Sequence, residues 1–206
     1  TMVLAEQGAD VVKVEPLAAD LIRTVGTGQN GMSAYFANLN RGKRSIVVDL
    51  DQPEGAELVR QLAAEADVVF QNFRPGVVDR LGVGYEDVKA VNPDVVYVSL
   101  SGFGSEGPYR GRSAYDTVIQ AYGGFAAAQA DPETHTPDFL RQTAADKVTA
   151  LFAGQAVTAA LFARERGRGG QHIELAMTDA VVSFLWADAA ANEVLMESDG
   201  SEPSSF

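Results

Sequence analysis

The sequence predicts an α/β fold, an open and mostly parallel Rossmann-like sheet with flanking helices. Short runs rich in valine and isoleucine alternate along the chain with segments whose apolar residues recur at helical spacing. The runs carry apolar residues at consecutive positions, which is typical of strands that are buried on both faces of a parallel sheet. Strands that alternate with helices favour right-handed crossovers in one open sheet.

The elements follow one another in a regular order. A short helix over residues 2–5 leads to Gly8 and a first strand. The predicted strands cover residues 11–15, 45–49, 67–70, 95–100 and 171–177. Asp51 is expected to cap a helix that has Pro53 in its first turn, because proline suits that position. Further helices are predicted over 85–91 and over 116–122, the second ending at Gly123 and Gly124.

An alanine-rich apolar helix begins near Asp146, and it is followed by a basic turn, the strand over 171–177 and a second helix. Asp146 has two interpretations. As a capping residue it would accept free backbone N–H groups at the start of the helix, worth about 0.5–2 kcal/mol. As a carboxylate partly withdrawn from water it would act as a nucleophile towards an activated acyl group. The position of Asp146 alone does not choose between them.

Composition excludes several function classes. The 206 residues are 46% hydrophobic and 21% charged, as expected of a globular domain that buries a core. The net charge of −12 opposes binding to nucleic acid or to an anionic membrane, so neither is expected as a partner. There is no cysteine, and His135 and His172 have no ligand-spaced partners, so no metal is expected. With no apolar run of about 18 residues and no signal-peptide pattern, the expected location is cytoplasmic.

Ligands of open α/β sheets gather beyond the carboxyl ends of the strands. That rule selects three segments: residues 50–51, 71–74 and 101–104. The densest positive charge, at Arg41, Lys43 and Arg44, is a further candidate for holding a phosphate. The basic run over 164–168 lies at a helix C-terminus, where the helix dipole is a sufficient explanation for it.

Four separated motifs occur in a specific order. They read LAEQGADVVKVE (4–15), NRGKRSIVVDL (40–50), DVVFQNFRPGVVDRLG (67–82) and the segment 144–180 that begins with AADKVTALF. In this order and spacing the chain resembles the class III coenzyme A transferase family, which also includes the alpha-methylacyl-CoA racemases. The resemblance covers nearly the whole chain, from Leu4 to Val194.

The resemblance implies that Asp146 matches the nucleophilic aspartate of the family. Its carboxylate would attack an acyl-CoA thioester to give an aspartyl anhydride and free CoA, and an enzyme-bound thioester would then pass CoA to a small carboxylic acid. The resemblance also implies a set of CoA-contacting residues, namely Val48, Asp49, Leu50, Asp51, Asn72, Phe73, Arg74, Arg80, Arg112, Ser113 and Tyr115. Without the resemblance, Phe73 would be interpreted as a core residue and Arg80 as a solvated helix residue.

The resemblance also has consequences for the whole chain. Relatives form interlocked homodimers and run to about twice this length, so both ends of the sequence look incomplete. Residues 1–196 are therefore expected to be most of a CoA-binding domain, and residues 197–206 a polar tail or linker. A glycine-rich loop that closes over the active aspartate would lie in a further C-terminal portion.

Departures from the family pattern discriminate among its activities. Racemases have a histidine at the position of Tyr115, and a tyrosine phenol, with its ordinary pKa near 10, is a poor general base at neutral pH. Transfer is therefore favoured over racemisation. Pro16 and Ser113 replace basic residues of the formyl-CoA branch, so formyl-CoA and oxalate specificity is not supported. An acyl-CoA hydrolase and a non-catalytic CoA-binding fragment remain as alternatives.

Overall fold

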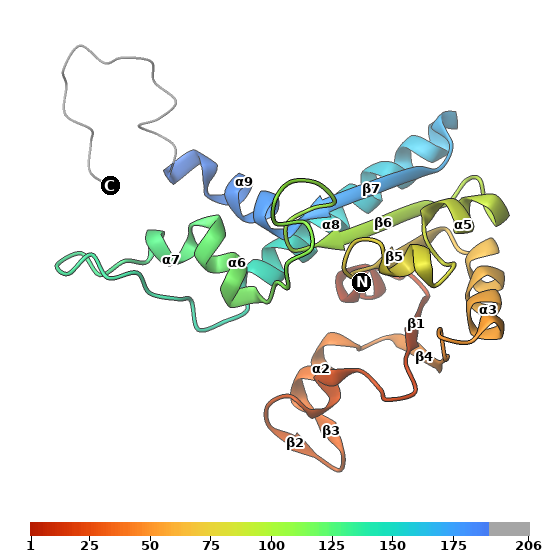
Figure 1. Cartoon of the computed structure of the whole chain (residues 1–206), viewed down its shortest axis with the longest axis horizontal. Helices are drawn as coiled ribbons and strands as arrows, with labels where there is room; N and C mark the ends of the chain where they lie inside the picture. The colour runs from red at the N-terminus through yellow and green to blue at the C-terminus, as the bar shows by residue number, and fades with distance from the viewer. Residues whose placement is uncertain (190–206) are drawn as a thin grey trace. The chain divides into compact units, whose positions relative to one another are not determined.

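The computed structural model describes residues 1–189 of the chain, whose helices and strands are drawn in Figure 1. These residues divide into two compact units. The first unit comprises Thr1–Ser99 and Ala153–Ile173, and the second comprises Leu100–Phe152 together with the segment that begins at Glu174. The chain passes between the units within three elements, which are the strands β6 and β7 and the helix α8. Residues 190–196 of the expected domain and the expected tail over 197–206 lie outside the described residues.

The first unit begins with helix α1 (Met2–Glu6) and a parallel pair of strands, β1 (Val11–Glu15) and β4 (Lys43–Val47). Between these strands the chain forms the 3₁₀ turn η1 (Leu21–Thr24), the hairpin strands β2 (Gly28–Gln29) and β3 (Met32–Ser33), and helix α2 (Ala34–Leu39). The hairpin was not predicted, because strands of two residues carry no periodicity.

Glu15, at the end of β1, is only 1% exposed and is held by opposite charge. The Arg23 guanidinium donates to both carboxylate oxygens, at 2.9 and 2.8 Å, and the Ser45 hydroxyl donates at 2.6 Å. These contacts, with that of Arg23 first, hold the pKa of Glu15 down at about 2. The pair ties the segment after β1 to β1 and β4.

The second sheet has the strand order β5–β6–β7, with β5 (Val68–Gln71) parallel to β6 (Val96–Ser101). The strand β7 (Gln171–Ala176) runs in the same direction as β6 in Figure 1. The hydrogen bonds agree, because the Gln171 N–H donates to Val95 O and the Thr178 N–H donates to Gly102 O, with the same residue offset. The consecutive apolar residues at the start of β6 are covered on both faces, and Val95, Val96, Tyr97 and Val98 are all buried.

Three helices of the first unit connect its strands. Helix α3 (Pro53–Ala64) follows β4, and α4 (Val77–Arg80) and α5 (Tyr85–Val91) lie between β5 and β6. Their apolar faces form two small cores. One contains Ala63, Val88, Val95 and Tyr97, and the other contains Ala56, Val78 and Val83.

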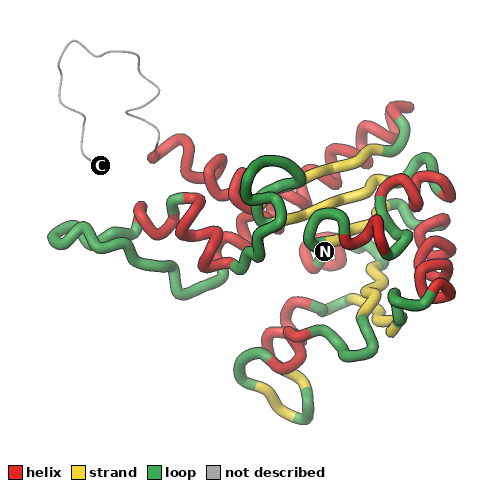
Figure 2. Tube along the Cα trace, viewed as in Figure 1, coloured by secondary structure: helices red, strands yellow, loops and turns green. Residues whose placement is uncertain are grey.

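The second unit is helical. It contains α6 (Asp116–Gly123), α7 (Phe125–Ala128), the first part of α8 (Ala144–Ala163) and α9 (Met177–Ala189). Their core consists of Ile119, Phe125, Ala145, Met177 and Val181. Figure 2 shows long loops before α6 and between α7 and α8. Gly124 ends α6 in the left-handed region, with φ 100°, as predicted for that glycine pair.

The mixed α/β class with parallel strands is confirmed, and most element boundaries agree within two residues. Two details differ. The parallel strands fall into two sheets, β1–β4 and β5–β6–β7, where the sequence predicted one. The residue that caps α3 is Gln52, so the prediction of Asp51 as the cap was wrong by one position, because Pro53 is the first residue of the helix.

The basic run after α8 makes structural contacts within the first unit, which differ from the helix-dipole role predicted for it. Arg164, in the π-type turn η2 (Arg164–Arg168), donates to the Asp67 carboxylate at 2.7 Å and to the Asp94 carbonyl oxygen at 3.4 Å. Within the described part of the chain, no helix combines the length and the apolar character needed to cross a membrane.

Candidate active site

Asp146 is the third residue of α8, in the first turn of the helix. The residue is exposed, and its side chain accepts no hydrogen bond from any residue over 1–189. A cap has its side-chain oxygen on a free N–H group of the helix start, and Asp146 does not. The interpretation of Asp146 as a helix cap is therefore wrong, and its carboxylate is left available for chemistry.

The capping role belongs to a different carboxylate, that of Asp116. Asp116 is the first residue of α6, and it is only 8% exposed. Its Oδ1 accepts a hydrogen bond of 3.0 Å from the backbone N–H of Asp146. Asp116 thus satisfies an N–H group at the start of α8 from across the second unit. Sequence reasoning gave Asp116 no role, because a cap supplied by another helix leaves no local pattern.

Gln120, one turn further along α6, completes this arrangement. It is fully buried, and its Nε2 donates to Asp116 Oδ2 at 2.6 Å. The same amide nitrogen donates to Leu140 O and Gln142 O at 3.1 Å, and its Oε1 accepts from Leu140 N at 2.9 Å. The amide therefore joins α6 to the segment that leads into α8. A buried and fully paired network of this kind specifies one geometry for the helix start.

Two influences raise the pKa of Asp146 from its ordinary 3.8 to about 6. The larger is the loss of hydration where surrounding protein covers part of the carboxylate, and the second is the negative charge of Asp116. Lys147 opposes them. A carboxyl group with this pKa is still ionised by roughly ten to one at pH 7. It is also more basic than an ordinary aspartate, and nucleophilicity towards an acyl carbon rises with basicity.

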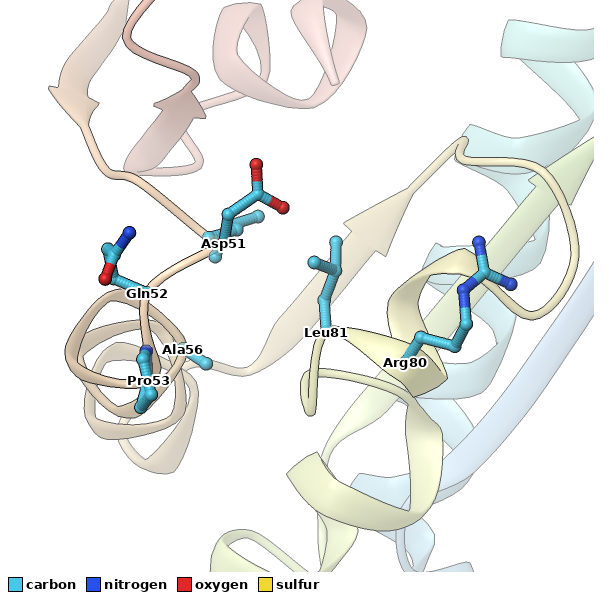
Figure 3. Close-up of a pocket in the computed structure, with 7 residues that line it drawn as sticks. Asp51, Gln52, Pro53, Ala56, Arg80 and Leu81 are labelled. Atoms are coloured by element: carbon cyan, nitrogen blue, oxygen red, sulfur yellow. The ribbon is translucent and has the colours of Figure 1, made fainter.

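A pocket of about 280 Å³ lies in the first unit, between the start of α3 and the end of α4 (Figure 3). It is lined by Leu50, Asp51, Gln52, Pro53, Ala56, Arg80 and Leu81. Three of these, Leu50, Asp51 and Arg80, belong to the CoA-contacting set that the sequence predicted. The structure therefore brings together residues from two separate motifs.

The first turn of α3 packs closely against the backbone of the residues that precede it. A Cβ atom on Gly55 would lie 1.9 Å from the Asp49 carbonyl oxygen, so only glycine lets this turn pack on residues 48–49. The Asp49 carboxylate accepts from the Asp51 N–H at 3.1 Å and fixes the turn. The Gln52 side chain does not cap the helix, so the pocket meets the positive end of the α3 dipole. The proline at the first helical position was the sequence signal for Gln52 and Pro53; Ala56 and Leu81 gave none.

The remaining residues predicted in the first unit do not line the pocket. Val48 is buried, and its N–H donates to Glu15 O at 2.9 Å. Asn72, Phe73 and Arg74 are exposed in the loop after β5, where the Phe73 N–H donates to Gln71 Oε1 at 2.8 Å. Phe73 is 45% exposed, so its interpretation as a core residue is wrong. Arg80, which does line the pocket, donates from its guanidinium to Gly76 O at 3.0 Å.

The last three predicted residues lie in the loop before α6, in the second unit. Arg112 lies over the ring of Tyr109, 4.5 Å from its centroid, and Ser113 is exposed. Tyr115 directly precedes Asp116 and is 73% exposed. The predicted residues of this loop thus share the second unit with Asp146.

The basic cluster over 41–44 has acidic or amide partners within the first unit. Arg41 pairs with Glu6, and the Arg44 Nε donates to Asp10 at 3.1 Å. Lys43 donates to Asn40 Oδ1 at 3.0 Å, and its pKa is lowered, chiefly by burial. These contacts account for the cluster as a structural feature.

Comparison with known proteins agrees with this architecture. The sequence profile of CoA-transferase family III matches residues 1–204. A succinate–glutarate CoA-transferase from Agrobacterium fabrum is 40% identical over 190 residues, which cover 88% of this chain and 47% of that protein. An acetyl-CoA:oxalate CoA-transferase from Acetobacter aceti is 38% identical, over 90% of this chain and 48% of that protein.

The structural comparison gives the same result. The crystal structure of a CaiB/BaiF family protein from Brucella suis is 40% identical, with a TM-score of 0.88 over 98% of this chain and 53% of that chain. The chain spans about half the length of the curated relatives that it matches. A family profile that matches nearly every residue, together with relatives at this identity, places the chain: it belongs to CoA-transferase family III.

Proposed function

We propose that this chain carries the nucleophile and part of the CoA site of an enzyme that moves coenzyme A from an acyl-CoA to a carboxylic acid. The observation that carries the proposal is the Asp146 carboxylate, which is exposed and basic at the start of α8 and is not used as a cap. Membership of CoA-transferase family III supports the reaction class.

The reaction follows from the chemistry of a carboxylate and a thioester. An ionised oxygen of Asp146 attacks the thioester carbon, the C–S bond breaks, and CoA leaves as its thiolate with an aspartyl anhydride remaining. The thiolate then attacks the aspartyl carbon, which releases the donor acid and leaves CoA on Asp146 as a thioester. The acceptor carboxylate attacks this thioester to form a second anhydride, and the thiolate takes the acceptor acyl group from it. Asp146 is regenerated.

The pocket at α3 is the proposed site for a phosphate-bearing part of CoA. The dipole of α3 and the Glu54 N–H in its first turn both favour an anion, and Arg80 lines the same pocket. Phe73 and Asn72, exposed in the loop after β5, are proposed to contact the adenine, since an exposed aromatic ring stacks on a base. Arg112, Ser113 and Tyr115 are proposed CoA contacts of the second unit.

The acceptor is a small carboxylic acid whose identity stays open. The two relatives have glutarate and oxalate in their names, and both match this part of the chain, which supports a carboxylic acid as the acceptor. An interlocked homodimer, a cytoplasmic location and a CoA-binding domain over residues 1–196 also remain predictions from the sequence.

The proposal is tested by following transfer between a panel of acyl-CoA donors and carboxylic acids, in the polypeptide as its gene encodes it. Asp146→Asn should abolish transfer to every acceptor while CoA still binds. Asp131→Asn is the matched control, because Asp131 is an exposed loop aspartate of the same unit, and it should keep normal activity. Transfer at the normal rate by Asp146→Asn would overturn the assignment, and thioester loss without an acceptor would identify a hydrolase.

A further inference from the structure

The second carboxylate of the site, Asp116, has no role in the reaction as written above. Its two oxygens are both committed, Oδ1 to the backbone of Asp146 and Oδ2 to the buried amide of Gln120. It is only 8% exposed, so it is not placed to attack a substrate itself. A buried charge held by two hydrogen bonds must be explained by what it does to its neighbours.

These contacts hold Asp116 in place, and Asp116 in turn positions the proposed nucleophile, Asp146. The bond to Asp146 is made by the backbone N–H of the nucleophilic residue itself, at 3.0 Å. The Cα of Asp146, and so the direction in which its side chain leaves the helix, depends on that bond. Gln120 cannot shift without breaking its contacts to Leu140 and Gln142, so Asp116 is itself held in place.

The negative charge of Asp116 has a second effect, which acts on the Asp146 carboxylate itself. Asp116 on α6 and Lys147 on α8 are the charged groups that act on the Asp146 carboxylate, and burial and Asp116 together outweigh Lys147. Other ionisable residues on the elements packed around this helix start, Arg141 before α8 and Asp179 on α9, are exposed and therefore screened by water. A neighbouring negative charge disfavours ionisation and so keeps the nucleophile basic.

We infer that Asp116 is a positioning residue for CoA transfer: it orients Asp146 through the backbone N–H and holds a negative charge beside the Asp146 carboxylate. The inference rests on the proposed nucleophilic role of Asp146. It assigns two functions to one side chain, and the pH midpoint and kcat report on them separately.

The test measures kcat, KM and the pH dependence of kcat for two variants, again in the polypeptide as its gene encodes it. Asp116→Asn keeps the shape and one acceptor oxygen for the Asp146 N–H, but it removes the charge and replaces the oxygen that accepts from Gln120 with an amide NH2 group. The midpoint of the pH profile should then move from near 6 towards the ordinary aspartate value of 3.8, with KM little changed. Asp116→Glu keeps the charge but displaces the oxygen, so kcat should fall on the order of 100-fold while the midpoint stays raised.

Asp131→Asn, the exposed aspartate of the same unit, is the control and should move neither quantity. Either a midpoint unchanged in Asp116→Asn or a normal kcat in Asp116→Glu would overturn the inference. If one of these variants fails to fold, the other still decides, because each predicts a separate change. Acyl labelling of Asp146 in the unsubstituted protein is measured in parallel. Loss of that label refutes the proposed function, whereas a normal label with unchanged Asp116 variants refutes only the role of Asp116.

Discussion

Asp146 and Asp116 show how two identical side chains take different roles through their surroundings. One is buried, accepts two hydrogen bonds and holds the start of α8, whereas the other is exposed and carries the raised pKa. The sequence led to the choice of Asp146 through the family resemblance, but it gave no reason to separate the nucleophile from the cap. The structure makes that separation, since the capping bond comes from α6.

At the residue scale, Asp146→Asn should stabilise the fold slightly at neutral pH. The folded-state pKa of about 6 lies above the ordinary 3.8, so the folded protein binds the proton more tightly than the unfolded chain. Ionisation of Asp146 therefore lowers the free energy of unfolding. This penalty is absent below the unfolded-state pKa of 3.8, and it grows as the pH rises to about 6. We expect a gain of at most about 1 kcal/mol in the free energy of unfolding at pH 7.5, because the residue is exposed.

Thermal unfolding of the unsubstituted protein and of Asp146→Asn at several pH values measures this gain in stability. The difference should disappear near pH 4. A clear loss of stability in Asp146→Asn at pH 7.5 would show that Asp146 does act as a cap.

Glu15→Gln should show the opposite pH dependence. The folded-state pKa of Glu15 is held at about 2, below the ordinary 4.5, so its ionised form stabilises the fold above pH 4.5 and this contribution is lost as the pH falls towards 2. Leaving Arg23 without its buried partner costs about 3 kcal/mol in the free energy of unfolding at pH 7. Urea unfolding at pH 7 and pH 3 measures the loss of stability in Glu15→Gln at each pH. An equal loss at the two pH values would show that the ionised Glu15 does not stabilise the fold.

At the element scale, the fold class and most strands and helices could be predicted, because buried parallel strands and amphipathic helices leave clear periodic patterns. The strand β1 and the helix α5 occupy the predicted residues. Predictions failed where geometry depends on distant residues. The cap of α8 is supplied from α6, and the two-residue strands β2 and β3 have no pattern.

Gly55→Ala tests the construction of the pocket at α3. The added Cβ would overlap the Asp49 carbonyl oxygen, so the start of the helix must move away. We expect this shift to lower the free energy of unfolding by about 1–3 kcal/mol. CoA affinity should fall as well, because the same turn lines the pocket.

Gly154→Ala is the matched control. Gly154 lies within α8, where an added Cβ meets no atom within 4 Å. Alanine there should stabilise the helix by about 1 kcal/mol. Calorimetry and CoA titration of both variants decide, and unchanged CoA affinity in a destabilised Gly55→Ala protein would remove this pocket from the CoA site.

At the scale of the whole molecule, the exposed apolar side chains of α9 bear on assembly. Trp186 is 58% exposed, and a large exposed aromatic residue is typical of a surface that another chain covers. If the predicted dimer buries Trp186, Trp186→Lys should lower the dimer fraction in sedimentation experiments. Leu17→Lys, at an exposed leucine of the first unit, should leave it unchanged. Equal dimer fractions in the two variants would exclude α9 from the interface.

The central claim is that Asp146 forms a covalent bond with the acyl group and then with CoA. Intact mass spectrometry after incubation with acyl-CoA donors, followed by hydroxylamine quenching and peptide mapping, tests it most directly. We expect a modified peptide that contains Asp146, dependent on the donor and absent from Asp146→Asn. A protein that transfers CoA at full rate while no donor labels this peptide would refute the covalent role of Asp146.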